Sequence, residues 1–237
     1  MAMNAPTSQP RPWDDRGRAE APSEGTSCVA EGNAAASARN GLARAVFVDK
    51  DGTLVHDVPY NVDPERITLI AGVGESLRRL QDAGFLLFVV SNQPGVALGR
   101  FPATALGAVE ARLDELLAPF GVMFTAYCWC PHPPVGVRAA VVCTCRKPRP
   151  GLLLDAAATH GVALERSWMV GDILDDIEAG NRAGCRTVLV DRGNETRWRA
   201  GRLRTPNAIV YQFADAAAMI LDGSRDVANE RPRAAPA

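Results

Sequence analysis

Ala45-Val46-Phe47-Val48-Asp49-Lys50-Asp51-Gly52-Thr53 joins a short apolar run to two carboxylates and a glycine turn. The run is short and β-branched or aromatic, which is typical of a buried parallel strand rather than a helix. Open α/β sheets bind ligands at the carboxyl ends of such strands. Because side chains alternate along an extended chain, Asp49 and Asp51 point the same way and could share a divalent cation or act as nucleophile and general acid. An ordinary Asp-Gly turn is the alternative interpretation.

Apolar runs alternate with helical patterns along the rest of the chain. We expect strands near residues 45–48, 86–90, 124–128, 168–171 and 186–190, and helices over 73–83, 103–118, 150–160 and 174–183. A further strand at 208–210 precedes a helix through Leu221. This order predicts an α/β fold, with a doubly wound, mostly parallel sheet flanked by helices and no large cap domain.

Composition divides the 237 residues into one domain and two polar ends. We expect residues 1–41 and 223–237 to be disordered, which leaves a single domain over 42–222. The formal net charge of -1 and the lack of a long basic run argue against nucleic acid as a partner. No apolar stretch has the length of a membrane span or the form of a signal peptide, so we expect a cytoplasmic protein without membrane contact, and a monomer.

Polar clusters also follow other predicted strands. Ser91-Asn92-Gln93 follows the second strand, Gly171-Asp172 follows the fourth, and Arg146-Lys147-Pro148 precedes a predicted helix. Together these groups offer what phosphoryl transfer needs, namely carboxylates for Mg²⁺ and a hydroxyl and a lysine for the phosphate oxygens. The candidates for this chemistry are Asp49, Asp51, Ser91, Lys147 and Asp172.

A cluster of cysteines and one histidine predicts a second metal site. Cys130, His132, Cys143 and Cys145 offer three thiolates and one imidazole, which is a closed ligand set for structural Zn²⁺. The loop between them has too little apolar content to fold unaided, so metal binding could supply its folding energy. Cys128 would share a strand face with Cys130 and is an alternative ligand. Reduced, buried cysteines beside a surface histidine are the other interpretation.

The motifs DKDGT, SNQ, RKP and GDxxxD, in this order after successive apolar runs, resemble the four motifs of the haloacid dehalogenase superfamily. The resemblance implies that Asp49 attacks phosphorus and forms an aspartyl phosphate. Asp51 would protonate the leaving oxygen and then activate water, while Ser91 and Lys147 hold the phosphoryl group. An aspartate at the second acidic position accompanies phosphatases rather than dehalogenases in this superfamily.

The resemblance also implies how the metals are held. Mg²⁺ would be bound by the Asp49 carboxylate, the Asp51 backbone carbonyl and Asp172. Asp176 would support these ligands without binding the metal itself. The CPH and CxCRKP segments resemble a group of sugar-phosphate phosphatases with a zinc loop, here over residues 130–145. Their spacing selects Cys130 rather than Cys128 as the zinc ligand.

The same group implies a small sugar phosphate as substrate, most closely the 7-phosphate of D-glycero-D-manno-heptose 1,7-bisphosphate. The expected substrate-binding residues are Asp57, Tyr60, Asn92, Gln93 and Arg146. Ile173 departs from the pattern, because these phosphatases commonly carry a lysine there that helps to bind substrate. Histidinol phosphate is the alternative substrate, and a zinc-loop interaction module without turnover is the alternative outside enzymes.

Overall fold

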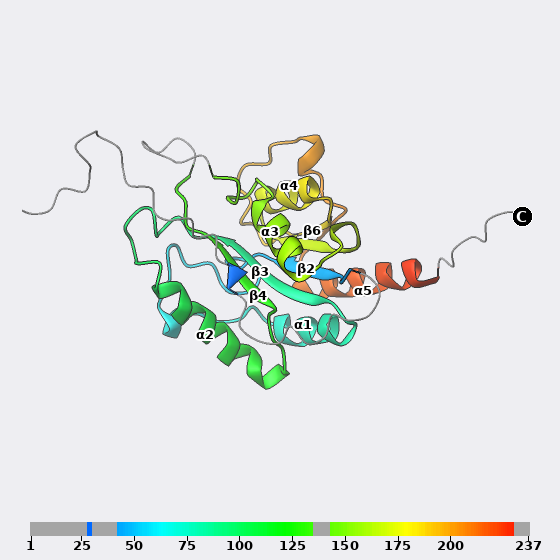
Figure 1. Cartoon of the computed structure of the whole chain (residues 1–237), viewed down its shortest axis with the longest axis horizontal. Coiled ribbons are helices and arrows are strands. Elements are labelled where there is room, and N and C mark those ends of the chain that lie inside the picture. The colour runs from blue at the N-terminus through cyan, green and yellow to red at the C-terminus, as the bar shows by residue number, and fades with distance from the viewer. Residues whose placement is uncertain (1–27, 30–41, 135–142, 230–237) are drawn as a thin grey trace, which may run out of the picture.

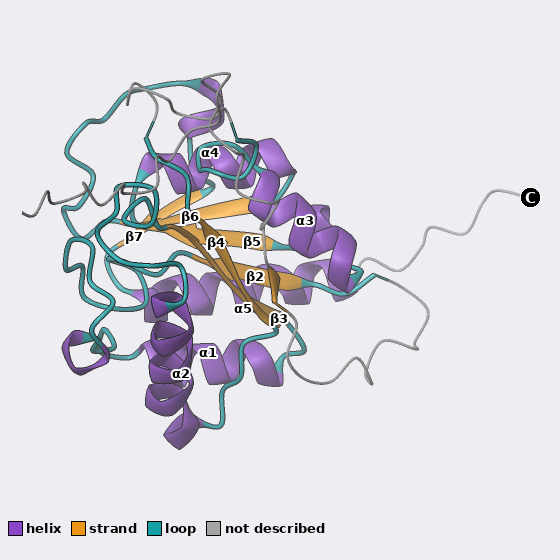
Figure 2. Cartoon of the chain, turned by 60° about the vertical axis from the view of Figure 1, so that its left-hand side comes forward, coloured by secondary structure: helices purple, strands orange, loops and turns teal. Residues whose placement is uncertain are grey.

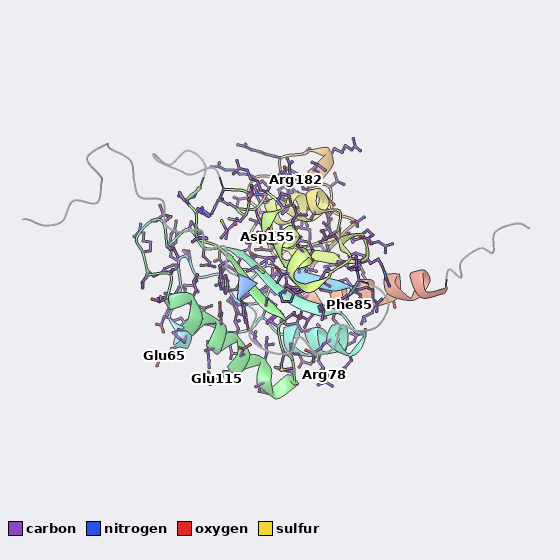
Figure 3. The ribbon with its side chains drawn as sticks, in the orientation of Figure 1. Glu65, Arg78, Phe85, Glu115, Asp155 and Arg182 are labelled. Carbon is purple, nitrogen blue, oxygen red and sulfur yellow. The ribbon has the colours of Figure 1, made fainter. Side chains whose placement is uncertain are left out.

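The computed structural model describes residues 28–29, 42–134 and 143–229 (Figure 1). Most of the two ends predicted to be disordered, and the middle of the predicted zinc loop, lie outside these ranges. Charged side chains such as Glu65, Glu115 and Arg182 lie exposed at the outside of the molecule (Figure 3). Within the described ranges, no helix is long and apolar enough to cross a membrane.

A seven-stranded sheet forms the centre of the molecule, with strand order β1-β4-β3-β2-β5-β6-β7. Its strands are β1 (Cys28–Val29), β2 (Ala45–Val48), β3 (Leu86–Asn92), β4 (Ala126–Cys130), β5 (Trp168–Gly171), β6 (Arg186–Val190) and β7 (Ala208–Val210). All neighbouring pairs from β4 to β7 are parallel, and β1 alone runs antiparallel, beside β4. The structure thus confirms the predicted doubly wound, mostly parallel sheet.

In the part of the chain that the structure describes, five α-helices cover the two faces of this sheet (Figure 2). They are α1 (Val73–Asp82), α2 (Ala105–Leu117), α3 (Gly151–His160), α4 (Leu174–Ala183) and α5 (Phe213–Asn229). Alternation along β2 explains the two layers, because Val46 and Val48 pack with α1, α2 and α5, whereas Ala45 and Phe47 pack with α3 and α4. Short 3-10 helices lie at Pro64–Arg66, Ala118–Phe120, Leu164–Arg166 and Arg202–Arg204.

Both ends of the domain extend beyond the predicted boundaries of 42 and 222. Cys28 and Val29 pair with Cys128 and Tyr127 at the edge of the sheet, although residues 1–41 were expected to be disordered. A strand of two residues is too short to show a hydrophobic periodicity in the sequence. In the fold it pairs with backbone N–H and C=O groups at the edge of β4 that would otherwise lack a neighbouring strand. Helix α5 continues to Asn229, since no proline interrupts the chain before Pro232.

The order of the sheet places a ligand site between β2 and β5. From β2 the chain proceeds to β3 and β4 on one side, and then returns to β5, β6 and β7 on the other. The connections from these two central strands therefore diverge at their carboxyl ends, which leaves a crevice in folds of this type. The backbone N–H of Asp49 donates to the carbonyl of Val170 at 2.9 Å and ties the two strand ends together.

Candidate active site

Three carboxylates converge at this crevice. Asp49 follows β2, Asp172 follows β5, and Asp176 lies in the first turn of α4. One oxygen of each lies within 4.8 Å of the others, and no more than 7% of any of these residues is exposed. So close a group of buried carboxylates is unfavourable unless positive charge accompanies it.

Lys147 supplies part of that charge. Its Nζ donates to Asp49 Oδ1 at 2.5 Å and to the Val90 carbonyl at 2.7 Å, and it lies 2.7 Å from Asp176 Oδ1. Burial alone would lower the pKa of Lys147, but the carboxylates of Asp176 and Asp49 outweigh burial and raise it. The lysine is therefore a cation inside the cluster.

One lysine does not balance three carboxylates. Burial raises the pKa of Asp49 well above its ordinary value, despite the opposing effect of Lys147. Burial and the neighbouring Asp176 raise the pKa of Asp172 to about 7. Apart from its ion pair with Lys147, Asp176 Oδ1 is buried without a hydrogen bond from any described residue. A divalent cation with oxygen ligands would relieve this crowding, so the donor set fits Mg²⁺.

Asp51 lies beside the cluster rather than within it. Its side chain is 30% exposed, and its two oxygens accept from Lys50 Nζ at 2.5 Å and from Gln93 Nε2 at 3.1 Å. The chain turns at Gly52, where φ is +82°, and a Cβ at this position would lie 2.0 Å from Asp172 Oδ2. Glycine therefore lets the backbone pass close to Asp172 while Asp51 faces the opening.

The segment after β3 supports the site in two ways. The buried Gln93 donates to Ser91 Oγ at 3.1 Å as well as to Asp51, so its amide holds two predicted catalytic residues. Asn92 binds the backbone of Lys147 on both sides, since its Nδ2 donates to the Lys147 carbonyl at 3.1 Å and its Oδ1 accepts from the Lys147 N–H at 3.0 Å. The amides of Asn92 and Gln93 therefore hold predicted catalytic residues in place.

A cavity of about 200 Å³ brings most of the predicted residues together. It is lined by Asp49, Asp51, Asp57, Ser91, Asn92, Lys147, Asp172, Ile173, Asp176 and Asn194. The predicted substrate residues Tyr60 and Arg146 do not line it. Tyr60 is 48% exposed and lies under the guanidinium of Arg100, whereas Arg146 Nη1 donates to the His132 carbonyl at 3.2 Å.

Two residues of the site were not predicted from the sequence. Asn194 donates from Nδ2 to Asp172 Oδ2 at 2.7 Å, and Thr53 Oγ1 lies 3.4 Å from Asp172 Oδ1. Asn194 belongs to the polar run Asp191–Asn194 directly after β6. A polar cluster at a strand end was the signal that identified the other residues, and it applied here as well.

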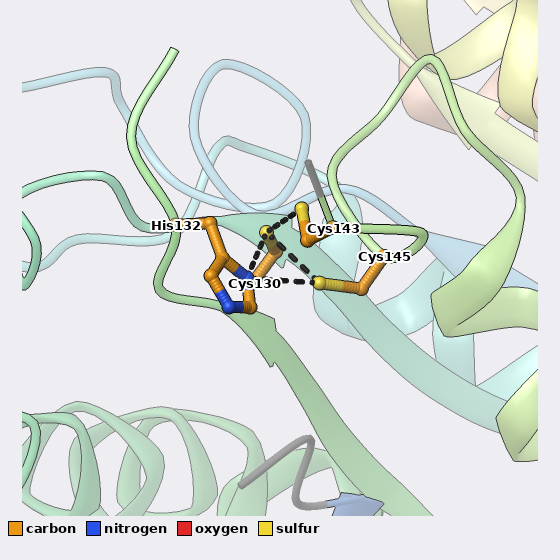
Figure 4. Close-up of side chains that lie close together, drawn as sticks. All are labelled: Cys130, His132, Cys143 and Cys145. Atoms are coloured by element: carbon orange, nitrogen blue, oxygen red, sulfur yellow. Dashed lines mark hydrogen bonds between the residues drawn. The ribbon is translucent and has the colours of Figure 1, made fainter. Parts of the chain in front are cut away.

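The cysteine and histidine cluster lies at the end of β4 (Figure 4). Cys130 Sγ is 3.9 Å from Cys143 Sγ, 3.2 Å from Cys145 Sγ and 3.5 Å from His132 Nδ1, which is 3.2 Å from Cys145 Sγ. Ligand atoms around tetrahedral Zn²⁺ are roughly 3.3–3.8 Å apart, given its usual bond lengths. The arrangement therefore fits Zn²⁺, and it joins the strand to the segment that carries Lys147. Cys128 lies outside this group.

Comparison with known proteins agrees with the fold and the site. A family model described as HAD-hydrolase-like matches residues 144–216. A D-glycero-D-manno-heptose-1,7-bisphosphate 7-phosphatase of Thermosynechococcus vestitus is 39% identical over 182 residues, which cover 74% of this chain and 93% of that protein. The D-glycero-beta-D-manno-heptose-1,7-bisphosphate 7-phosphatase of Escherichia coli is 36% identical, over 69% of this chain and 83% of its own.

A solved structure shows the same likeness. The crystal structure of D,D-heptose 1,7-bisphosphate phosphatase from B. bronchiseptica, complexed with magnesium and phosphate, superposes with a TM-score of 0.67 at 31% identity. The match covers 76% of this chain and 99% of that one. The present chain therefore belongs to the haloacid dehalogenase-like family of hydrolases, among its phosphomonoesterases.

Proposed function

We propose that the protein removes the 7-phosphate from D-glycero-D-manno-heptose 1,7-bisphosphate through an aspartyl phosphate on Asp49. The observation that carries the chemistry is the contact of Asp49 with Lys147 inside the buried carboxylate cluster. The likeness to the two heptose bisphosphate phosphatases supports the substrate. Both the cavity of about 200 Å³ and the lack of a large cap in the described ranges favour a small molecule.

In the first step, an oxygen of Asp49 bonds to phosphorus as the bond from phosphorus to the sugar oxygen breaks. Ser91 Oγ and Lys147 Nζ line the cavity and would hold phosphoryl oxygens, which stabilises the developing charge. Asp51 would give its proton to the leaving sugar oxygen. Its place at the opening of the cluster suits this role, because the sugar must lie on the solvent side of the phosphate.

In the second step, water attacks phosphorus and the bond to Asp49 breaks, which restores the nucleophile and releases phosphate. Asp51 would take the proton from that water, after losing its own in the first step. The contacts from Lys50 and Gln93 hold its two oxygens in place throughout. One residue therefore acts first as acid and then as base.

The proposed Mg²⁺ ligands are Asp49, Asp172 and the backbone carbonyl of Asp51, and Asp176 supports them. When bound, the cation supplies positive charge to the phosphoryl oxygens. The proposed Zn²⁺ ligands are Cys130, His132, Cys143 and Cys145, which match a closed structural site. We propose a purely structural role for this zinc. We further propose a cytoplasmic monomer whose catalytic domain comprises residues 42–222 together with strand β1 and the last turns of α5.

Ile173 favours one alternative. It puts an apolar side chain into the reactive cavity, where relatives were expected to carry lysine, and a substrate with one phosphate such as histidinol phosphate needs no second cation there. A comparison of phosphate release from both substrates, in Mg²⁺ and then in EDTA, tests the two proposals. We expect Mg²⁺-dependent release mainly from the bisphosphate. Release from histidinol phosphate alone would contradict the proposed substrate, and release from neither would contradict the proposed activity.

A further inference from the structure

A second cavity adjoins the reactive one on the side of Ile173. Ile173 and Asn194 line both cavities, so the two cavities adjoin at these residues. The second cavity has a volume of about 390 Å³. Its other lining residues are Asp175, Glu195, Thr196, Arg197, Arg199 and Arg204.

The loop after β6 is fixed against the catalytic residues at this boundary. Asn194 binds Asp172, and the next residue, Glu195, accepts the Leu174 backbone N–H at 2.9 Å through Oε2. Glu195 Oε1 accepts the backbone N–H of Arg197 at 2.7 Å. These bonds join Asn194 to Asp172 and Glu195 to the start of α4, so the loop that carries Arg197 and Arg199 is anchored beside Ile173.

The three arginines of this cavity differ in their partners. Arg204 is paired with Asp175 at 2.9 Å and with Glu178 at 2.8 Å. The exposed guanidinium groups of Arg197 and Arg199 make no ion pair or hydrogen bond with a described residue. Among the described residues that line this cavity, Glu195 is the acidic one without a basic partner, and it already accepts two backbone N–H groups. The cavity therefore offers two cations that the fold itself does not use.

We propose that Arg197 and Arg199 form a second anion subsite, which binds the phosphate that is not cleaved while the other phosphate lies against Asp49. A guanidinium presents paired donors that match phosphate oxygens. This subsite would supply the positive charge that Ile173 does not. The inference rests on the proposed function, because it applies only to a substrate with a second anionic group.

The test compares Arg197→Ala/Arg199→Ala with wild type on two substrates. Heptose 1,7-bisphosphate carries the second phosphate, and p-nitrophenyl phosphate does not. We expect KM for the bisphosphate to rise about 10-fold or more, on the scale of one or two charge-assisted hydrogen bonds, with kcat and KM for p-nitrophenyl phosphate unchanged. Arg192→Ala/Arg202→Ala is the matched control, since it removes two exposed arginines from the same region that line neither of the two cavities.

A rescue variant distinguishes the loss of positive charge from a structural defect. Adding Ile173→Lys to the double arginine variant should lower KM for the bisphosphate again, because it places a cation at the same boundary. An unchanged bisphosphate KM in the arginine variant, or an equal loss on both substrates, would overturn the subsite. Failure of the wild type on the bisphosphate, with p-nitrophenyl phosphate still cleaved, would instead contradict the proposed substrate.

Discussion

Asp49, the proposed nucleophile, occupies a strongly unfavourable electrostatic position. It is buried beside two other carboxylates, and Lys147 is the one side-chain cation in direct contact with it among the described residues. Burial raises its pKa, so the site must gain positive charge before the carboxylate is fully available. The proposed Mg²⁺ and Lys147 would therefore support the same carboxylate.

Asp49→Asn keeps the shape of this side chain and removes its nucleophilic oxygen. We expect phosphate release to fall by about 10⁴-fold or more, the scale on which loss of a catalytic nucleophile acts. Thermal unfolding should show an intact fold, because the variant also removes one of the crowded charges. Asp82→Asn is the control, since Asp82 is exposed on α1 and pairs with Arg78, far from the carboxylate cluster in the fold. Substantial turnover by Asp49→Asn would exclude Asp49 as nucleophile.

Asn92 acts on the site through the backbone of Lys147. In Asn92→Ala, one N–H and one C=O lose their side-chain partners, so we expect the free energy of unfolding to fall by about 1–3 kcal/mol. We expect kcat to fall with it, because Lys147 is no longer held opposite Asp49. Urea unfolding and steady-state kinetics measure the two effects. An unchanged kcat would show that the lysine keeps its place without Asn92.

The residues of the site were predictable where they follow strands. Asp49, Ser91 and Asp172 come directly after or at the end of apolar runs, and the structure brings them together at one edge. Contacts between side chains far apart in sequence were not predictable. The contacts that the buried amide of Gln93 donates to Asp51 and Ser91 were not expected, and Asn194 was not predicted as a site residue; substrate binding by Gln93 stays a prediction.

At the scale of elements, the sequence predicted which segments form the main strands. It did not always predict the residues at which each strand begins and ends. The third strand was expected at 124–128 but forms β4 at Ala126–Cys130. A shift of two residues keeps every side chain on its face, so Cys128 and Cys130 still share one. The two-residue strand β1 and the last turns of α5 depend on tertiary pairing and helix continuation, which apolar periodicity does not report.

We expect the position of Lys147 to depend on the proposed zinc ligands, of which Cys143 and Cys145 precede it closely in sequence. We expect Cys145→Ser to lose most of its bound zinc, to unfold at lower temperature and to lose kcat, because Cys145 is separated from Lys147 by a single residue. Metal analysis of the purified protein and thermal unfolding measure these effects. Cys185→Ser is the control, because this buried cysteine lies outside the cluster and burial raises the pKa of its thiol to about 12. Equal zinc content in both variants would contradict the ligand assignment.

At the scale of the whole molecule, the carboxylate cluster should make stability depend on pH and metal together. The folded-state pKa of Asp172, about 7, lies above its ordinary value, so the native protein retains a proton that the unfolded chain has lost. This contribution to stability is present at low pH and is lost as pH rises through about 7. In EDTA we therefore expect a lower unfolding temperature near pH 8 than near pH 5, and a larger stabilisation by Mg²⁺ near pH 8.

Asp172→Asn provides the comparison for that measurement. Without a titrating group at this position, the fall in stability between about pH 5 and pH 8 should be smaller than in wild type. Mg²⁺ should also raise the unfolding temperature of the variant less than that of the wild type, because the variant has lost a proposed ligand. The same pH profile and the same Mg²⁺ response in both proteins would contradict the assignment of Asp172 to the metal site.

Asp51→Asn tests most directly whether Asp49 and Asp51 divide one reaction between them. The leaving group of p-nitrophenyl phosphate needs no proton, so this variant should still form the aspartyl phosphate but hydrolyse it slowly. Rapid mixing should therefore release a burst of about one p-nitrophenol per enzyme before slow turnover, with the phosphoryl group mapped to Asp49 by mass spectrometry. Linear release without a burst, or a phosphoryl group on another residue, would contradict the account.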